Sequence, residues 1–487
     1  MKKYNLFIAS VFVGALSLSS CKKFLDINKS PNSAEKVDPK LLFSGATVSH
    51  AALRASGDFY IPIALGAQII ADGGNNPTAW DAPSAGEYVF STNYFGNTWS
   101  AYTNTIINLK QTIAIAEASS PKNNNAAAQS KVFMAQTFYD LTCLFGDIPF
   151  SEAVRSDVSY PKFDTQKQVF EGCIALLDEA LAQFDEASSL KIGSSPDQAY
   201  DVFYRGDIAK WKKAAKSMKL RILMTMVDKD ATKAAAIGQL ITGGGLISSA
   251  ADNMKMSFVN AAGRKNPKFA LSEQYNGGDN FFFASKYVAD FMRPLNDPRL
   301  PKFFDKPAAA DNYYGITPGD DGDDNHDARI AKSLHAADEP ELFFSYQEEL
   351  FFEAEAYARG LGVAVDLAKA STLYKKAVEE SCKYFGVDAT TAASFAAGLP
   401  ALTSVAEPVK LIHYHHWIDK MEEPGEAFTE WRRSGADGNE VPALTLPVGA
   451  PSTPLFRRYE YHLSNELLLN PNAPAQLKYY EKVWFDL

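Results

Sequence analysis

Amphipathic helical segments recur along most of the 487-residue chain, and this recurrence is the strongest constraint on its fold. A chain of this length exceeds what a single simple core usually serves, roughly 250–300 residues, so two domains or an extended helical array are expected. Apolar residues repeat at the helical period over 38–72, 99–118, 129–145, 165–184, 208–227 and 231–247. The sequence therefore predicts a mainly α-helical array.

Residues 346–385 are the clearest repeat-like unit of this array. The stretch 346–360 ends in A-x-A-Y-x-x-G, and the stretch 366–385 carries A-x-x-x-Y-x-x-A. Both patterns, joined by a short turn that contains Gly, are typical of a tetratricopeptide helix pair. Residues 129–145 followed by 165–184 are a looser second candidate. We expect a tetratricopeptide-like helical array as the scaffold.

Two long segments interrupt the helical pattern. Residues 73–97 are dense in Gly, Asn, Pro and aromatic residues, and residues 250–340 combine Pro and Gly with aromatic clusters and an acidic run. Loops this long in a compact protein are usually functional or disordered, and many aromatic residues argue against disorder. We therefore expect an irregular, loop-rich ligand-binding region beside the helical scaffold.

The N-terminal segment predicts export and lipidation. Lys2 and Lys3 precede an apolar run that is shorter than the roughly 20 residues of a membrane-spanning helix. The following Leu-Ser-Ser-Cys sequence, which ends at Cys21, resembles the lipobox of bacterial lipoproteins. We expect residues 1–20 to be a signal peptide, residues 21–40 a lipidated tether that attaches to the membrane through Cys21, and residues 41–487 a single helical domain.

Charge and motifs exclude several classes of function. The formal net charge of −10 disfavours nucleic acid as a partner. HExxH, GxSxG and GxxxxGK[ST] motifs are all absent from the sequence, so we predict a protein that is not an enzyme. Cys143, Cys173 and Cys382 have no metal-like spacing, and we expect each to be a small buried hydrophobic residue.

Four ordered stretches together resemble the SusD/RagB family, in particular its SusD-like subgroup of nutrient-binding outer-membrane lipoproteins of Bacteroidota. The stretches are F-L-D-I-N at 24–28, L-F-G-D-I-P-F at 144–150, E-A-E-A-Y-A-R-G at 353–360, and residues 417–435 with W-R-R-S-G at their end. A matching tail follows at 457–471. Most of these residues have a structural explanation: Gly146 and Pro149 end a helix, and Trp431, Arg432 and Arg433 are expected to pack and to pair with carboxylates of the scaffold.

The resemblance implies a location and a function. Members of the family are not enzymes; they lie on the outer face of the outer membrane and close over captured nutrient as the lid of a SusC-like TonB-dependent transporter. The nutrient is usually a glycan, and some members bind peptides. We therefore expect a lipid-anchored cell-surface protein that captures oligosaccharides. A peptide-binding lid and, with less support, a surface glycoside hydrolase are the alternatives.

Loop aromatic residues beside amides and carboxylates are the candidates for sugar contact. A sugar ring stacks its C–H face on an aromatic plane, while its hydroxyls need polar partners. Trp80 fits best because no helical periodicity surrounds it, although a place in the core remains an equal alternative. Phe281, Phe282 and Phe283 lack a hydrogen-bonding edge and are expected to fill the core. The full set of expected ligand contacts is Asn75, Asn76, Trp80, Asp81, Tyr88, Tyr94, Tyr287, Tyr313 and Tyr314.

Two groups of residues raise the question of metal binding. Closely spaced carboxylates around a Gly turn can bind calcium, which prefers six to eight oxygen ligands. A solvated acidic loop is the favoured alternative, and calcium is the only cofactor that the sequence suggests. His413 and His416 would share a helix face, but their ligand set is incomplete, so a structural role is favoured. The candidate calcium ligands are Asp320, Asp321, Asp323, Asp324 and Asp327.

Overall fold

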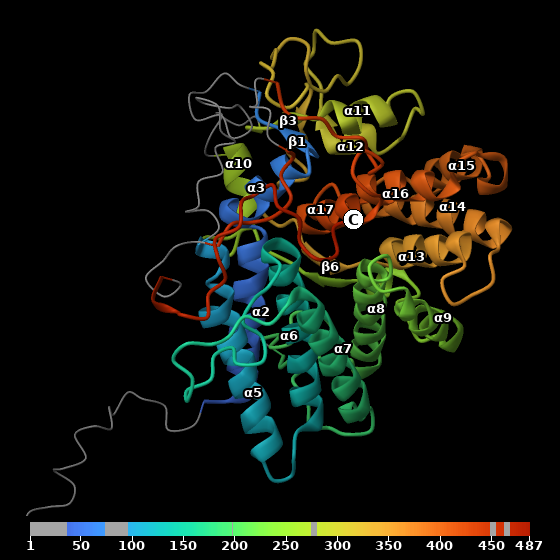
Figure 1. Cartoon of the computed structure of the whole chain (residues 1–487). Helices are drawn as coiled ribbons and strands as arrows, with labels where there is room; N and C mark the ends of the chain where they lie inside the picture. Colours follow the sequence, from blue (N-terminus) through green and yellow to red (C-terminus); the bar gives the residue numbers. More distant parts are fainter. Residues whose placement is uncertain (1–36, 74–95, 197, 274–279, 449–453, 462–467) are drawn as a thin grey trace, which may run out of the picture. The chain divides into compact units, whose positions relative to one another are not determined.

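A computed structural model describes residues 37–73, 96–196, 198–273, 280–448, 454–461 and 468–487 of the chain. Helices dominate it, and its strands are two to four residues long (Figure 1). This confirms the prediction of a mainly α-helical protein. In the described residues, no helix combines the length and the apolar character that crossing a bilayer requires.

The first half of the chain forms the helices α2, α3 and α5 to α9. α2 and α5 lie side by side, α5 packs on α6, and α6 packs on α7 (Figure 1). A five-residue π-helix, η1 (Tyr102–Ile106), leads directly into α5. The bounds are α2 (Pro39–Arg54), α3 (Gly57–Gly66), α5 (Ile107–Ala118), α6 (Asn124–Phe145), α7 (Gln166–Gln183), α8 (Ile208–Met226) and α9 (Ala234–Gly243).

The second half begins with short elements and ends in longer helices. Three short helices, α10 (Ala270–Glu273), α11 (Lys286–Met292) and α12 (Leu300–Phe303), belong to the irregular region. The longer helices that follow are α13 (Tyr346–Arg359), α14 (Leu367–Tyr384), α15 (Ala389–Gly398), α16 (Pro408–Asp419) and α17 (Pro424–Arg433). Among the described residues, four short 3-10 helices also connect these elements. They are η2 (Ala231–Lys233), η3 (Ala250–Asp252), η4 (Pro267–Phe269) and η5 (Leu402–Ser404).

The helix ends follow from local chemistry. The Ser345 hydroxyl caps α13 by accepting the backbone N–H of Glu348, and the Asp366 carboxylate caps α14 in the same way. Gly360 ends α13 in a left-handed conformation at φ 74° that disfavours most other residues. α13 and α14 then pack against each other over much of their length. The predicted tetratricopeptide-like pair is therefore present, with bounds one residue from those expected.

The stretch 38–72, which the sequence predicts to be helical, forms two helices and a short strand. The chain leaves the helical conformation at Ser56, whose backbone is extended at ψ 156° and whose hydroxyl donates to the carbonyl of Leu53 (2.7 Å). A second helix starts at Gly57 and is followed by a strand. The apolar periodicity continues through the break because both helices bury their residues in the same core, so periodicity alone did not reveal it.

A small antiparallel sheet joins the two irregular regions. Its strands are β1 (Ile70–Ala71), β3 (Phe283–Ala284), β5 (Arg329–Ile330) and β4 (Phe304–Asp305), in the order β1-β3-β5-β4. β1 ends where residues 73–97 begin, and the other three strands belong to residues 250–340. A second sheet pairs β2 (Met254–Met256) with β6 (Glu341–Phe344). The first sheet thus places the described chain just before the first irregular segment next to strands of the second.

Buried ion pairs hold the helical scaffold together. The guanidinium of Arg54 on α2 pairs with Asp140 on α6 (3.0 Å), Glu341 on β6 (3.0 Å) and Glu426 on α17 (3.1 Å). Arg221 on α8 pairs in the same manner with Glu348 on α13 (2.6 Å). All of these side chains are almost completely buried. Because each arginine joins helices far apart in the sequence, the network fixes how the two halves of the chain pack.

Candidate functional site

A polar pocket of about 250 Å³ opens beside the four-stranded sheet. β4, β5 and the connections next to them supply most of its wall. Its charged side chains are three carboxylates and three cationic groups, so the lining offers both hydrogen-bond acceptors and donors. The lining residues are Asn280, Asp305, Lys306, Pro307, Asp324, Asp327, Arg329, Ile330 and Lys332. Such a surface suits a ligand rich in hydroxyl groups better than an apolar one.

Arg329 organises the pocket wall. Its guanidinium donates to the backbone carbonyls of Asn280 and Phe281 (both 2.9 Å) and to the Asp324 carboxylate (2.5 Å). The guanidinium also lies 3.8 Å from the ring centroid of Phe283. These contacts engage both terminal nitrogens of the Arg329 guanidinium, so we assign it a positioning role. Lys306, which donates to the carbonyl of Ala310 (2.6 Å), and Lys332 are exposed in the pocket wall and are the more accessible cationic groups.

The acidic loop predicted to bind calcium forms part of this pocket through Asp324 and Asp327. Its carboxylates are engaged by the protein itself: Asp327 accepts the backbone N–H of Asp323 (2.9 Å) and lies 2.6 Å from Nδ1 of His326. No three carboxylates of the loop, which is fully described, bring oxygens within 4.8 Å of one another. As arranged here the loop forms hydrogen-bonded turns rather than a calcium cage, and calcium binding stays a prediction.

The three described tyrosines of the predicted ligand set lie outside the pocket lining. Tyr314 stacks on His326 (4.3 Å between centroids, 15°) and its hydroxyl donates to Asp311 (3.0 Å), which raises its pKa. Tyr313 packs against the core, where burial raises its pKa. The hydroxyl of Tyr287 is hydrogen-bonded to Thr445 (2.7 Å). Tyr314 and its loop adjoin the pocket, whereas Tyr287 lies elsewhere.

The other predicted contacts, Asn75, Asn76, Trp80, Asp81, Tyr88 and Tyr94, lie outside the described residues, as does Cys21. The point where the chain enters that segment is nevertheless fixed. The backbone carbonyl of Gly73 accepts the N–H of Gly322 in the acidic loop (2.9 Å), and both glycines lie against the ring of Phe283, where a Cβ would clash. Gly73, the last described residue before this gap, is therefore held beside the acidic loop that lines the pocket.

A second cavity, an open groove of about 530 Å³, has a mainly apolar lining. Residues 438–443 form one wall, and the start of α16 with the preceding loop forms the other. Tyr414 lies in the groove and is supported from behind by Phe291 (3.7 Å between centroids, 8°). Glu407 and Lys410 pair with each other at the rim (2.7 Å). The groove offers few unpaired polar groups for hydroxyls.

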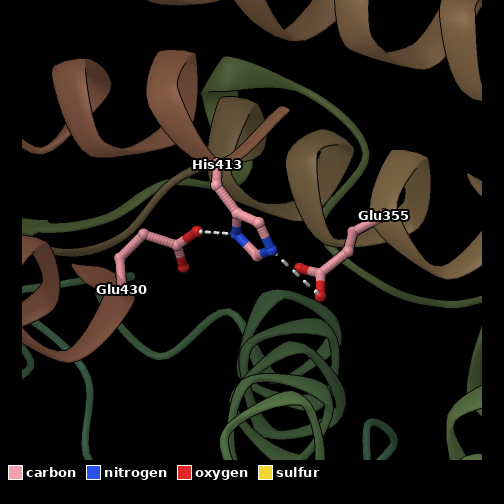
Figure 2. A group of neighbouring side chains, drawn as sticks. All are labelled: Glu355, His413 and Glu430. Atoms are coloured by element: carbon pink, nitrogen blue, oxygen red, sulfur yellow. Dashed lines mark hydrogen bonds and ion pairs between the residues drawn. The ribbon is translucent and has the colours of Figure 1, made fainter. Parts of the chain in front are cut away.

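A buried group of three side chains has the composition of a metal site. Figure 2 shows His413 between Glu430 and Glu355: Nδ1 lies 2.6 Å from Glu430, and Nε2 lies 3.8 Å from Glu355. Among the described residues it is the only group whose three ligand atoms lie within 4.8 Å of one another. The guanidinium of Arg433 pairs with both glutamates (2.8 and 2.6 Å) and already supplies their counter-charge. This supports the structural role expected for His413.

The W-R-R segment also has the expected structural role. Trp431 is buried and donates its indole N–H to the carbonyl of Pro442 (3.1 Å). Arg432 is buried over the ring of Phe428 (3.8 Å) and donates to the carbonyl of Arg457 (2.8 Å). Cys143, Cys173 and Cys382 are buried free thiols, as expected. Phe282 and Phe283 are buried in the core, and Phe281 packs against it.

Sequence analysis missed most of the pocket, namely Asn280, Asp305, Lys306, Arg329 and Lys332. These residues have no shared spacing, and only the pairing of two-residue strands brings them together. Two further lining residues, Asp324 and Asp327, belong to the acidic run, for which the sequence suggests a different chemistry, calcium binding. The mixed charge of residues 302–332 was the one signal that could have indicated this pocket.

Several solved structures share this fold. A chitin-binding protein is 23% identical and aligns over 92% of this chain and all of its own, with a TM-score of 0.73. A SusD homologue from Bacteroides vulgatus is 18% identical over 87% of this chain and 91% of its own, with a TM-score of 0.71. A SusD/RagB family protein from Bacteroides thetaiotaomicron is 20% identical and aligns over 93% of this chain and 99% of its own, with a TM-score of 0.69.

No curated protein matches the sequence. Residues 67–461, which include the helices α5 to α17, both sheets and the polar pocket, match the SusD-like family described as starch-binding and associating with the outer membrane. The match covers more than half of the chain and agrees with the ordered stretches found in the sequence. The chain therefore belongs to this SusD-like family.

Proposed function

We propose that this protein captures oligosaccharides at the outer surface of the outer membrane and binds them in the polar pocket beside the four-stranded sheet. The observation that carries this proposal is the convergence of three features on one site. The pocket has a mixed polar lining, the acidic loop with Tyr314 adjoins it, and Gly73 is hydrogen-bonded to that loop. The family description of starch binding and the chitin-binding neighbour support a glycan ligand.

The proposal includes delivery to a partner. The captured glycan passes to a SusC-like TonB-dependent transporter, over which this protein closes as a lid. Lipid on Cys21 holds the protein at the membrane, with each buried acyl CH₂ contributing about 0.8 kcal/mol. The protein acts by binding and not by catalysis. Two carboxylates of the pocket support this, because Asp324 and Asp327 already accept hydrogen bonds from Arg329 and from the backbone N–H of Asp323.

An affinity screen of the chain from Lys22 to Leu487 tests the proposal. Calorimetry against maltooligosaccharides, chitooligosaccharides, other neutral glycans and peptides should give heat with at least one glycan. The double variant Lys306→Ala/Lys332→Ala removes two exposed cationic donors from the pocket. A hydrogen bond to a charged donor contributes about 1.5 kcal/mol or more, so the variant should bind that glycan at least about tenfold more weakly.

A matched control comes from the second cavity. Lys410→Ala removes one exposed lysine from the rim of the apolar groove and should leave glycan affinity unchanged. Equal binding by wild type and by the double variant, with a loss in Lys410→Ala, would move the glycan site to the groove. Hydrolysis of any glycan by the purified protein would contradict the non-catalytic role.

The apolar groove favours one alternative function, a lid that retains peptides. Its floor of Val405, Leu411, Tyr414, Val441 and Pro442 suits aliphatic and aromatic side chains better than sugar hydroxyls. Peptide heat in the screen, lost in a Leu411→Asp variant and retained in Lys306→Ala/Lys332→Ala, would support this alternative over the glycan.

A further inference from the structure

The outward faces of α2 and α5 form an uncharged surface on a strongly charged protein. Lys, Arg, Asp and Glu make up 22% of the chain, and surfaces usually carry about 25–35% of these residues, or about three in ten positions. None of the exposed positions on α2, η1 and α5 is charged. They are Leu41, Gly45, Val48, Ser49, Thr103, Asn104, Ile107, Gln111, Ala114 and Ala118. This set is called the α2/α5 face below.

The face includes side chains that water disfavours. Leu41, Val48 and Ile107 are exposed by 51%, 41% and 42%. α2 and α5 are adjacent helices (Figure 1), and Thr105 and Thr112 of η1 and α5 reach the carbonyls of Ala46 and Pro39 (both 3.5 Å). These contacts show that the helices run antiparallel with Ile107 at the level between Leu41 and Val48, so the three exposed side chains lie at neighbouring levels of adjacent helices.

The few charged side chains on these helices are engaged by the protein itself, and Glu117, whose side chain is 40% exposed, lies in the last turn of α5. Arg54 is buried in its ion network, and Lys40 lies 4.9 Å over the ring of Tyr200. Lys110 donates to the carbonyl of Ala153, and Glu117 pairs with Lys131 (3.1 Å). By contrast α7, at the other side of α6, exposes three acidic residues: Glu171, Asp178 and Glu179. The absence of charge is therefore specific to one side of this helical layer.

We propose that the α2/α5 face is the surface through which this protein docks on an uncharged patch of its partner transporter. The inference rests on the proposed function, because the transporter partnership is part of it. Charged residues are depleted at the centres of protein interfaces, as they are here. The chain itself indicates a partner embedded in the membrane. α2 starts at Pro39, 18 residues after the expected lipid attachment at Cys21, and 18 residues span at most about 60 Å.

Gly45 provides a variant that blocks the face without disturbing the fold. It is exposed near the middle of α2, and a Cβ added there meets no atom within 4 Å. Arg is a better helix former than Gly, so Gly45→Arg should fold and melt like wild type or slightly higher. Gly398, at the end of α15, is also exposed with no atom within 4 Å of an added Cβ. Gly398→Arg is therefore the matched control.

The test uses the full-length protein expressed in its native cells with a photo-crosslinking residue at Val48 or, as control, at exposed Val365. The expected result is a crosslink from Val48, but not from Val365, to a protein whose peptides identify it as a TonB-dependent transporter. Gly45→Arg should reduce this crosslink and the co-purified transporter at least tenfold, whereas Gly398→Arg should not.

The other outcomes separate the two proposals. Equal transporter recovery with wild type and Gly45→Arg would overturn the docking face and leave the partnership intact. Absence of transporter with wild type would overturn the partnership itself. A crosslink from Val48 to a second copy of this chain, together with a dimer in light scattering, would assign the face to self-association. Binding of the purified protein to phosphatidylethanolamine vesicles, if Gly45→Arg abolishes it, would assign the face to the lipid surface.

Discussion

Replacing Arg433 by methionine tests whether the W-R-R segment serves the scaffold or the ligand. The buried guanidinium of Arg433 contacts Glu355 (2.8 and 3.1 Å) and Glu430 (2.6 and 2.7 Å). Methionine keeps a long unbranched side chain but removes the charge, which leaves two buried carboxylates short of a partner. Breaking a buried ion pair from one side costs about 3–5 kcal/mol. We expect the free energy of unfolding to fall by this amount at pH 7.5.

The pKa of Glu355 gives the sign of the expected dependence of stability on pH. Burial alone would raise this pKa, but Arg433, His413 and Arg359 outweigh it and lower the pKa to about 2. A carboxylate whose folded pKa lies below the unfolded value stabilises the protein above the unfolded pKa and loses this contribution as the pH falls through the folded value. The ionised Glu355 carboxylate therefore stabilises the folded protein at neutral pH, and Arg433 is the largest of the three influences that lower its pKa.

The pH dependence distinguishes charge loss from loss of packing. Without Arg433, the pKa of Glu355 and Glu430 should rise, and the variant should take up protons as the pH falls from 7.5 towards 4.5. The difference in unfolding free energy between wild type and variant should then narrow over this range. Urea unfolding followed by tryptophan fluorescence at pH 7.5, 6.0 and 4.5 measures it.

Lys212→Met is the matched control, because Lys212 pairs with Glu186 (2.8 Å) while both side chains are partly exposed. This variant should change the free energy by no more than about 0.5 kcal/mol. For Arg433→Met, a loss below about 1 kcal/mol, or a loss of the same size at all three pH values, would refute the reasoning. Weaker glycan binding with unchanged stability would assign Arg433 to the ligand.

Three further predictions follow from the residues that the sequence singled out and from the buried acids. Trp80→Ala should weaken glycan binding and leave the melting temperature nearly unchanged; a large drop in melting temperature with unchanged affinity would place Trp80 in the core. Adding calcium should produce heat in calorimetry if the acidic loop binds it through Asp320, Asp321, Asp323, Asp324 and Asp327. The absence of heat, together with an unchanged melting temperature when a chelator is added, would contradict the calcium site. Burial and nearby Glu422 raise the pKa of Glu339 to about 7, above its unfolded value. Ionising this buried carboxyl therefore destabilises the folded protein, an effect that is absent at low pH and complete above pH 7. Glu339→Gln should therefore raise the melting temperature at pH 8 and change little at pH 5; the reverse order would contradict the assignment.

The scaffold was predictable because its helices carry strong local signals. α8 (Ile208–Met226) and the pair α13 and α14 follow the expected ranges to within a residue or two, since capping residues and an apolar stripe mark them in the sequence. α6 starts five residues earlier than expected because the Ala-rich run at 126–128 is buried on all sides and has no stripe. Periodicity detects a half-buried helix better than a fully buried one.

The pocket and the ion network were beyond sequence reasoning because they depend on long-range pairing. Two-residue strands such as β4 and β5 leave no alternating pattern, yet they bring Asp305 next to Arg329. The sequence indicates His413 and His416 as a pair with an incomplete ligand set, and the carboxylates beside His413, Glu355 and Glu430, come from other helices. The carboxylates of the acidic run were expected to serve one ion, and Asp324 instead pairs with Arg329 in the pocket wall.

The most direct test of the account is hydrogen–deuterium exchange of the chain from Lys22 to Leu487 with and without the oligosaccharide that gives heat in the affinity screen. The account predicts that the sugar slows exchange in residues 303–332 and in segment 74–95, which follows Gly73, the residue hydrogen-bonded to the acidic loop. Residues 400–414 and 438–443, which form the apolar groove, should be unchanged. Protection confined to the groove, with residues 303–332 exchanging as in the free protein, would contradict glycan capture in the polar pocket.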